Sequence, residues 1–225
     1  MSCLRCLKIH VEATIETPLC LESFKISDRI YRIDCNMCKK FINLKVGNEV
    51  IDINEPNEKF GSYWRMALNN RDKIIYYILS QILYPEFDTP DPTKMESPYE
   101  FADEFDKIII RWENGKAIGF YTIKPKGCKN SLTNEEYMMP IIDTVYIRSE
   151  YRNQGYGTEM LKDIVTRFPN DDIGFSKPIS FGMQKVLKKF LLCYKQHRRH
   201  FWEIADHDMN DSQQLIWFNL KNKNF

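Results

Sequence analysis

The sequence lacks three features that would assign it to a broad class at once. It has no run of about 18 apolar residues, the length that a membrane-spanning helix needs. Its formal net charge is only +1, which provides no overall field to attract nucleic acid or an anionic membrane. Its start, MSCLRCLKIHVEAT, lacks the apolar stretch and cleavage site of a secretory signal. We therefore expect no membrane insertion and no direct nucleic-acid binding.

The cysteines indicate a reducing compartment. Seven cysteines, an odd number, in a chain without a secretory signal are typical of reduced thiols in an intracellular protein, cytoplasmic or nuclear. Two Cys-x-x-Cys pairs, Cys3 with Cys6 and Cys35 with Cys38, have four thiolates that could bind zinc tetrahedrally. The 28 residues between the pairs exceed the usual spacing, and unrelated reduced cysteines are the alternative, so we assign no metal.

The sequence also has no internal repeat, no low-complexity tract and no Gly/Ser linker. Its 225 residues are enough for one substantial hydrophobic core. We therefore expect one domain at residues 41–225, preceded by an N-terminal extension at residues 1–40.

Apolar periodicity predicts a strong helix and a hairpin in the first half of this domain. In RDKIIYYILSQILY, the apolar residues fall on one stripe of a helix. The following PEFDTPDPTKMESP carries four prolines and several acids, which predicts a loop. Asn114-Gly115 lies between two β-rich runs, DKIIIRW and AIGFYTI, an arrangement typical of a β-hairpin.

The remaining segments predict further strands and helices. They are a helix at about Glu58 to Leu68, a strand at Pro140 to Ile147, a helix ending at Phe168, a short strand in DDIGFSKPI, a helix from Phe181 to about Gln196, and strands in HFWEIA and QLIWFNL. This order indicates an α/β domain with a mixed sheet.

The stretch YRNQGYGTEML, Tyr151 to Leu161, follows the strand at Pro140 to Ile147 and begins a helix. The start of a helix carries unpaired N–H groups and the positive end of the dipole, so it favours a phosphate. Gly155 and Gly157 would let a bulky anion approach the backbone closely. A Walker loop is excluded because Thr158-Glu159 follows the second glycine, and a dinucleotide fingerprint would need glycine where Met160 lies.

The remaining pattern, Arg-x-x-Gly-x-Gly directly after a strand, resembles a known family. PIIDTVYIRSEYRNQGYGTEML is similar to the acyl-CoA-binding segment of the GCN5-related N-acetyltransferase (GNAT) superfamily, and WENGKAIGFYTI resembles its central hairpin. A closer resemblance, through AIGFYTIKPKG, PIIDTVYIRSEYR and FWEI, is to the soluble lamin-associated protein family of acetyltransferase-like proteins. The resemblance covers about Phe41 to Phe218. It implies a GNAT-type acyl-CoA N-acyltransferase fold, with a mixed, mostly antiparallel sheet flanked by helices.

The resemblance also implies a cofactor site. The diphosphate of acetyl-CoA would bind the backbone amides of residues 153–158, and its pantetheine arm would run beside Tyr146 and Ile147. One backbone N–H there would polarise the thioester carbonyl. The implied cofactor-binding residues are Tyr146, Ile147, Arg152, Asn153, Gln154, Gly155, Tyr156, Gly157 and Thr158.

Two residues are candidates for the acid–base chemistry. Asp143 shares a strand face with apolar residues, so we expect its carboxyl pKa to be raised and its role to be general base. A carboxylate held by a backbone group is the alternative. In the resembled superfamily, a tyrosine of the next helix often protonates the leaving thiolate. Phe190 occupies that position here, and Tyr194 could serve only in a different register.

Three functions follow from these observations. The first is an acetyl-CoA-dependent N-acetyltransferase that acts on an amine of a protein or a small molecule. The second is a catalytically inactive member of the same fold that binds a partner protein, nuclear or cytoplasmic. The third is an interaction module stabilised by zinc. The glycine-containing loop favours the first, whereas Phe190 favours the second.

Overall fold

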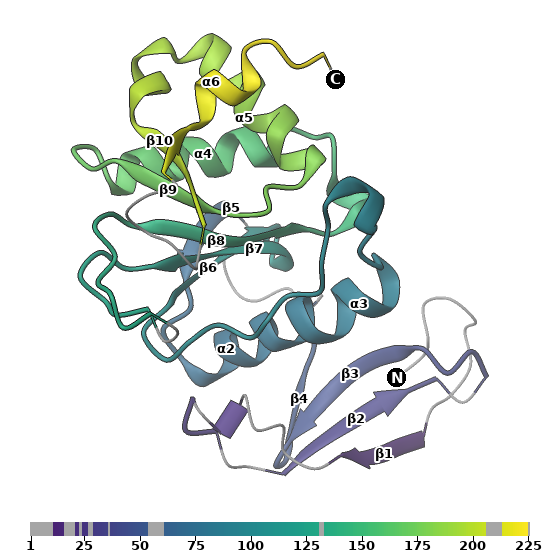
Figure 1. Cartoon of the computed structure of the whole chain (residues 1–225). Helices are drawn as coiled ribbons and strands as arrows, with labels where there is room; N and C mark the ends of the chain where they lie inside the picture. The colour runs from purple at the N-terminus through teal and green to yellow at the C-terminus, as the bar shows by residue number, and fades with distance from the viewer. Residues whose placement is uncertain are drawn as a thin grey trace.

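A computed structural model describes residues 11–15, 21–22, 24–26, 29–35, 37–53, 61–130, 133–205 and 213–224, with the backbone alone at 11–15. Within these ranges the chain forms a seven-stranded sheet, a smaller four-stranded sheet and helices between and beside them (Figure 1). None of the helices in these ranges combines the length and the apolar character that a membrane crossing requires.

The seven-stranded sheet is mostly antiparallel. Its spatial order is β11-β10-β9-β8-β7-β6-β5, and only β8 with β9 and β9 with β10 pair in parallel. The strands are β5 (Ser62–Met66), β6 (Lys107–Glu113), β7 (Lys116–Lys124), β8 (Ile141–Ile147), β9 (Ile173–Ser176), β10 (Phe201–Ile204) and β11 (Gln214–Leu215). The predicted hairpin is confirmed as β6 and β7, with Asn114 at φ 49° and Gly115 at φ 80° in its turn.

Helices cover both faces of this sheet (Figure 1). One face carries α2 (Asn70–Tyr77), the π-helical turn η1 (Ile78–Leu83) and α3 (Tyr84–Phe87). The other carries α4 (Tyr156–Arg167), α5 (Phe181–Cys193) and the short α6 (Ile216–Leu220). Short 3-10 turns occur at η2 (Pro92–Lys94), η3 (Ser149–Tyr151) and η4 (Lys195–Arg199). The mixed α/β architecture expected from the sequence is therefore confirmed.

The four-stranded sheet packs on the outer side of α2 and α3. Its strands are β1 (Val11–Ile15), β2 (Ile30–Asp34), β3 (Phe41–Val46) and β4 (Glu49–Ile51). One apolar core joins its buried side chains to those of α2 and the large sheet. Because α2 lies between two sheets, its apolar residues are buried on more than one side. The paired strands β2 and β3 lie on either side of residue 40. The division into an extension and a domain at this residue stays a prediction.

Two sequence predictions about elements were wrong. Residues 62–66, expected in a helix, form β5, which pairs with β6 along its whole length. In this strand the side chains of Tyr63 and Arg65 point to one face and that of Trp64 to the other. Residues 58–60 lie outside the described residues. QLIWFNL, expected to be a strand, is a strand only at its first two residues. Ile216 and Leu220, four residues apart, are both buried on one face of α6.

Candidate functional site

A cleft opens where β8 and β9 part. They pair only at Ile141 with Gly174 and at Ile142 with Phe175. Beyond these pairs, β8 stays paired only with β7, and β9 stays paired only with β10. Two residues of β8, Asp143 and Thr144, stand opposite one residue of β7, which makes a β-bulge at the point of separation.

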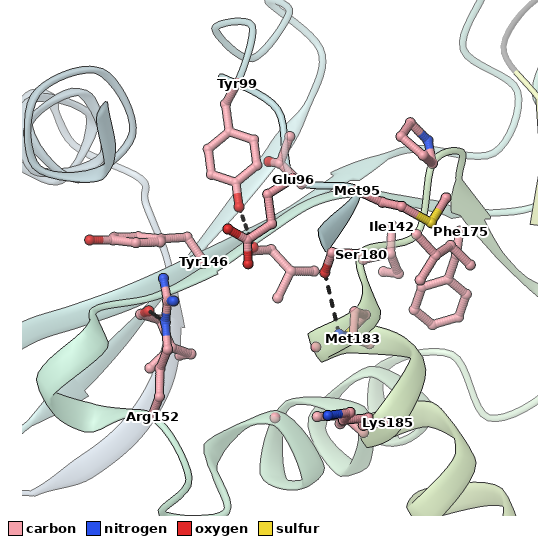
Figure 2. A pocket seen from close by; sticks show the side chains of 18 of the residues that line it. Met95, Glu96, Tyr99, Ile142, Tyr146, Arg152, Phe175, Ser180, Met183 and Lys185 are labelled. Atoms are coloured by element: carbon pink, nitrogen blue, oxygen red, sulfur yellow. Dashed lines mark hydrogen bonds between the residues drawn. The ribbon is translucent and has the colours of Figure 1, made fainter. Parts of the chain in front are cut away.

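The cleft has a volume of about 650 Å³, within the range of pockets that hold small organic ligands. Its walls are β8, the end of β9, the start of α4, the first half of α5 and the loop 95–100 (Figure 2). The sequence-predicted residues among its lining are Asp143, Tyr146, Ile147, Arg152, Asn153, Gly155, Tyr156, Gly157 and Thr158. Gln154 and Tyr194 are not part of the lining.

The start of α4 presents free amide groups to this cleft. Gly155 precedes the helix at φ +94°, a left-handed conformation that favours glycine, and no side chain caps the helix. The amides of Thr158 and Glu159 donate to the Gly155 carbonyl, at 2.9 and 3.1 Å. Within the described residues, the amides of residues 153–157 have no hydrogen-bond acceptor. The N-terminus of this twelve-residue helix can therefore stabilise an anion.

Helix α5 adds two cations beside this anion site. It lies close to α4, because a β-carbon placed on Gly157 would be 3.0 Å from both methyl carbons of Val186. Lys185 and Lys189, on the same side of α5 as Val186, line the cleft. The glycine therefore permits a close helix contact, and Lys185 and Lys189 line the same cleft as the start of α4.

Arg152 binds the protein rather than pointing freely into the cleft. Its Nε donates to the Ile147 carbonyl at 2.8 Å, and its terminal nitrogen lies 3.8 Å from Asp88. Tyr99, from the loop across the cleft, donates its hydroxyl to the Val145 carbonyl at 2.6 Å. In a strand, the N–H and C=O of one residue point to the same side, so the amides of Val145 and Ile147 face the cleft as well.

Asp88 fixes the loop between β8 and α4. Its Oδ2 accepts hydrogen bonds from the Tyr146 hydroxyl and the Ser149 amide, both at 2.7 Å. Burial, together with the nearby Asp88 charge, raises the pKa of Tyr146 above its ordinary value. Tyr146 therefore remains a protonated hydrogen-bond donor, and it anchors β8 beside the cleft.

Asp143 lies in the β-bulge, at the point where the two strands separate. The Ser176 hydroxyl donates to its Oδ1 at 2.7 Å, and Lys124 Nζ lies 3.9 Å from its Oδ2. Its carboxylate therefore has polar partners, whereas the sequence had suggested apolar neighbours. Lys124 also contacts Asp103 at 3.1 Å and Asp106 at 3.5 Å, and burial raises the pKa of Asp106 to about 6.

Phe190, at the position on α5 where a tyrosine acid was expected, does not line the cleft. Phe190 is buried and stacks on Phe201, with ring centroids 5.8 Å apart. Tyr194, at the end of α5, stacks on Phe190 at 4.6 Å. The cleft-facing residue of this turn is Lys189. The sequence offered no tyrosine acid at this position, and the orientation of α5 explains why neither ring reaches the cleft.

The other predicted loop residues have local roles. Gln154 donates its side-chain amide to the Glu150 carbonyl at 3.1 Å, and Asn153 has a left-handed φ of 62°. Tyr156 lies under the Arg111 guanidinium, 4.8 Å from the ring centroid. The zinc alternative stays a hypothesis because Cys3 and Cys6 lie outside the described residues, and no potential metal-binding cluster occurs within the described part.

The cleft residues that sequence reasoning missed include Tyr99, Ser176, Lys185 and Lys189. The two lysines are four residues apart on a predicted helix, a spacing that could have indicated a shared face. No local signal identifies Tyr99, whose partner Val145 is 46 residues further along the chain.

Comparisons with known proteins find one matching family model and several similar proteins. Residues 75–182 match the model of the Acetyltransferase (GNAT) family. The chain is 33% identical over 160 residues to Protein FAM169B of Mus musculus, covering 66% of this chain and 45% of that protein. It is 33% identical over 120 residues to Protein FAM169BP of Homo sapiens, covering 51% of this chain and 60% of that protein. The chain thus spans about half the length of these curated relatives.

One solved structure that the comparison matches to this chain is a predicted acetyltransferase from Clostridium acetobutylicum, crystallised with acetyl-CoA. It is 18% identical, with a TM-score of 0.40, and the match covers 58% of this chain and 88% of that one. Neither curated relative's name refers to lamin, so the resemblance to lamin-associated proteins stays a prediction.

Proposed function

Because the chain carries a domain of the acetyltransferase (GNAT) superfamily at residues 75–182, we propose that it transfers an acetyl group from acetyl-CoA to an amine. The acceptor amine belongs to a protein or to a small molecule. The observation that carries this proposal is the cleft between the parted strands β8 and β9, which has the free amides of α4 at one end.

The phosphate end of the cleft suits a diphosphate. The amides of residues 153–157 and the dipole of α4 stabilise negative charge, and Lys185 and Lys189 add two positive charges on the neighbouring helix. A β-carbon on Gly155 would enter open space, so this glycine keeps a side chain away from the surface, whereas Gly157 permits the close contact with Val186. These groups bind and orient acetyl-CoA, with Arg152 holding the adjacent strand end in place.

The edge of β8 is suited to the acyl end. Acetyl-CoA supplies an acetyl group already activated as a thioester. The amides of Val145 and Ile147 face the cleft, where either can donate to the thioester oxygen as negative charge develops on it. Because these donors are fixed by the strand, they need little reorganisation during the reaction.

Asp143 is the candidate general base. An amine attacks only when it is neutral, whereas a lysine side chain has a pKa of about 10.4. The Asp143 carboxylate lines the cleft, and the Ser176 hydroxyl fixes one of its oxygens. It can therefore accept the amine proton, directly or through one water.

The experiment that tests cofactor binding is thermal unfolding with acetyl-CoA. A ligand at about 100 times its dissociation constant stabilises by roughly 2.7 kcal/mol, which raises the midpoint of a domain of this size by about 5–10 °C. We expect Lys185→Glu or Lys189→Glu to remove most of that rise. Lys188→Glu is the matched control, since Lys188 lies on the same helix but does not line the cleft. A wild-type midpoint unchanged at millimolar acetyl-CoA would refute the proposal.

A second candidate function is a catalytically inactive member of the fold that binds partner proteins. One observation favours it: none of the α5 residues that line the cleft is a tyrosine, the residue type that often protonates the leaving thiolate in the resembled superfamily; they are Gly182, Met183, Lys185, Val186 and Lys189. Acetyl-CoA binding without acetyl transfer to any of a panel of peptides, polyamines and aminoglycosides would select this second function. A nuclear or cytoplasmic partner then remains to be identified by its own binding experiment.

A further inference from the structure

The cleft-facing edge of β8 offers donors, but side chains already occupy its acceptors. The Val145 carbonyl accepts the Tyr99 hydroxyl at 2.6 Å, and the Ile147 carbonyl accepts Arg152 Nε at 2.8 Å. The amides of the same two strand residues face the cleft beside these carbonyls. An extended ligand that lies along this edge therefore finds places for its carbonyl groups and none for its N–H groups.

Tyr99 is held firmly in this position. Its ring stacks on Tyr84 with centroids 4.3 Å apart and an interplanar angle of 15°. Gln81 donates to the Tyr99 carbonyl at 3.2 Å, and Tyr84 donates to the Ser97 carbonyl, also at 3.2 Å. Burial raises the pKa of Tyr99 well above its ordinary value, so the hydroxyl stays a donor.

The loop that carries Tyr99 crosses the cleft from one helical layer to the other. At its beginning, the Met95 sulfur accepts a hydrogen bond from Gln184 of α5 at 3.8 Å. At its end, Tyr99 contacts Tyr84 of α3. Figure 2 shows Tyr99 and Met95 on the opposite side of the cleft from Lys185. The hydrogen bond of Tyr99 to the Val145 carbonyl is drawn there as a dashed line. Tyr99 therefore lies where the arm of a ligand would pass to reach the junction of β8 and β9.

We propose that Tyr99 lowers the affinity for ligands that carry the pantetheine arm of acetyl-CoA, because its hydroxyl competes with the arm for the Val145 carbonyl. This inference rests on the proposed function. The arm contains two amide groups, and pairing with a strand edge requires a free carbonyl for at least one of their N–H groups. To bind fully, the arm must displace the Tyr99 hydroxyl. A nucleotide without the arm binds at the phosphate end and leaves Tyr99 undisturbed.

Two ligands separate these parts of the site. Adenosine 3′,5′-bisphosphate carries the 3′-phosphate and the first 5′-phosphate of the coenzyme but lacks the second phosphate of the diphosphate and the arm, whereas acetyl-CoA carries all of these groups. Isothermal titration of both ligands into wild type and Tyr99→Phe shows whether the Tyr99 hydroxyl affects the binding of acetyl-CoA and not that of the ligand without the arm. We expect Tyr99→Phe to bind acetyl-CoA about three- to tenfold more tightly, the equivalent of one net hydrogen bond. Its affinity for adenosine 3′,5′-bisphosphate should match the wild type, which also shows that the fold is intact.

Tyr84→Phe is the matched control. It removes a tyrosine hydroxyl that holds the same loop through Ser97. The Tyr84 ring also packs against Tyr146 of β8, with centroids 5.2 Å apart, and phenylalanine keeps that ring contact. We expect it to leave the affinity for both ligands within about twofold of wild type, less than the effect of one hydrogen bond. If Tyr84→Phe raises the affinity for acetyl-CoA as much as Tyr99→Phe does, general loosening of the loop is the cause, and the proposal is overturned.

The remaining outcomes are also decisive. Equal or weaker acetyl-CoA binding by Tyr99→Phe, while wild type still binds both ligands, overturns the role of Tyr99 and leaves the proposed function standing. A changed affinity for adenosine 3′,5′-bisphosphate in Tyr99→Phe overturns it as well, because the effect then reaches beyond the arm. If wild type binds neither ligand, the proposed function fails, and this inference fails with it.

Discussion

A β-carbon on Gly157 would lie 3.0 Å from both Cγ atoms of Val186. This distance means that α4 and α5 approach each other as closely as a glycine allows. The contact brings the start of α4, with its free amides, close to the helix that carries Lys185 and Lys189, and both parts line the cleft, so the packing of two helices determines the shape of the anion site.

We predict that Gly157→Ala destabilises the protein through this contact. Overpacking at a rigid, β-branched neighbour costs about 1–3 kcal/mol. In a Val186→Ala background the clash is absent, and the same glycine change should stabilise by up to about 1 kcal/mol, since alanine favours a helix. Urea denaturation of the four proteins of this cycle measures the coupling. An equal cost in both backgrounds would show that Val186 is not the obstacle.

The sequence could predict those parts of the site that depend on local chemistry. Asn114-Gly115 specified the hairpin because both residues adopt left-handed conformations, and the glycines of Tyr151 to Leu161 indicated the start of α4. The register of α5 was not predictable in the same way. Which of Lys189 and Phe190 faces the cleft depends on how α5 packs against β10 and α4, a contact that spans distant parts of the chain.

The same limit applies to β5 and to the loop that carries Tyr99. Residues 62–66 contain two aromatic residues that fit a helix or a strand, and only pairing with β6 makes them a strand. Prolines and acids predicted a loop at residues 85–98, but residues 85–87 belong to α3 and residues 92–94 form a 3-10 turn. The path of the remaining loop across the cleft depends on its anchors. Gln81, Tyr84 and Gln184 supply those anchors, and none of them follows a recognisable pattern.

A second prediction concerns Asp88, whose side chain is only 5% exposed. Asp88→Ala leaves the buried Tyr146 hydroxyl and the Ser149 amide without their acceptor, which should cost about 2–4 kcal/mol of unfolding free energy. The cost should fall by at least about 1 kcal/mol in a Tyr146→Phe background, where one of the two donors is already absent. Chemical denaturation gives both values. Additive effects of the two changes would argue against the hydrogen bond between these side chains.

The third prediction uses the buried carboxylate of Asp106. Its side chain is 4% exposed and lies 3.5 Å from Lys124, and burial raises its pKa to about 6. In the unfolded chain an aspartate has a pKa of about 3.9, so between these values the folded state binds the additional proton. This group therefore contributes stability that is fully present below about pH 4 and is lost as the pH rises through about 6.

Asp106→Asn isolates this contribution, because asparagine resembles the protonated acid and does not titrate. The difference in unfolding free energy between wild type and Asp106→Asn should move in favour of wild type by about 1.4 kcal/mol as the pH falls from 7.5 to 5. Most other titrating groups are common to both proteins, so their effects cancel in the difference. Urea denaturation at several pH values provides the measurement. Parallel stability curves, or divergence in the opposite direction, would mean that the cluster around Lys124 keeps Asp106 ionised, and the burial argument would then fail.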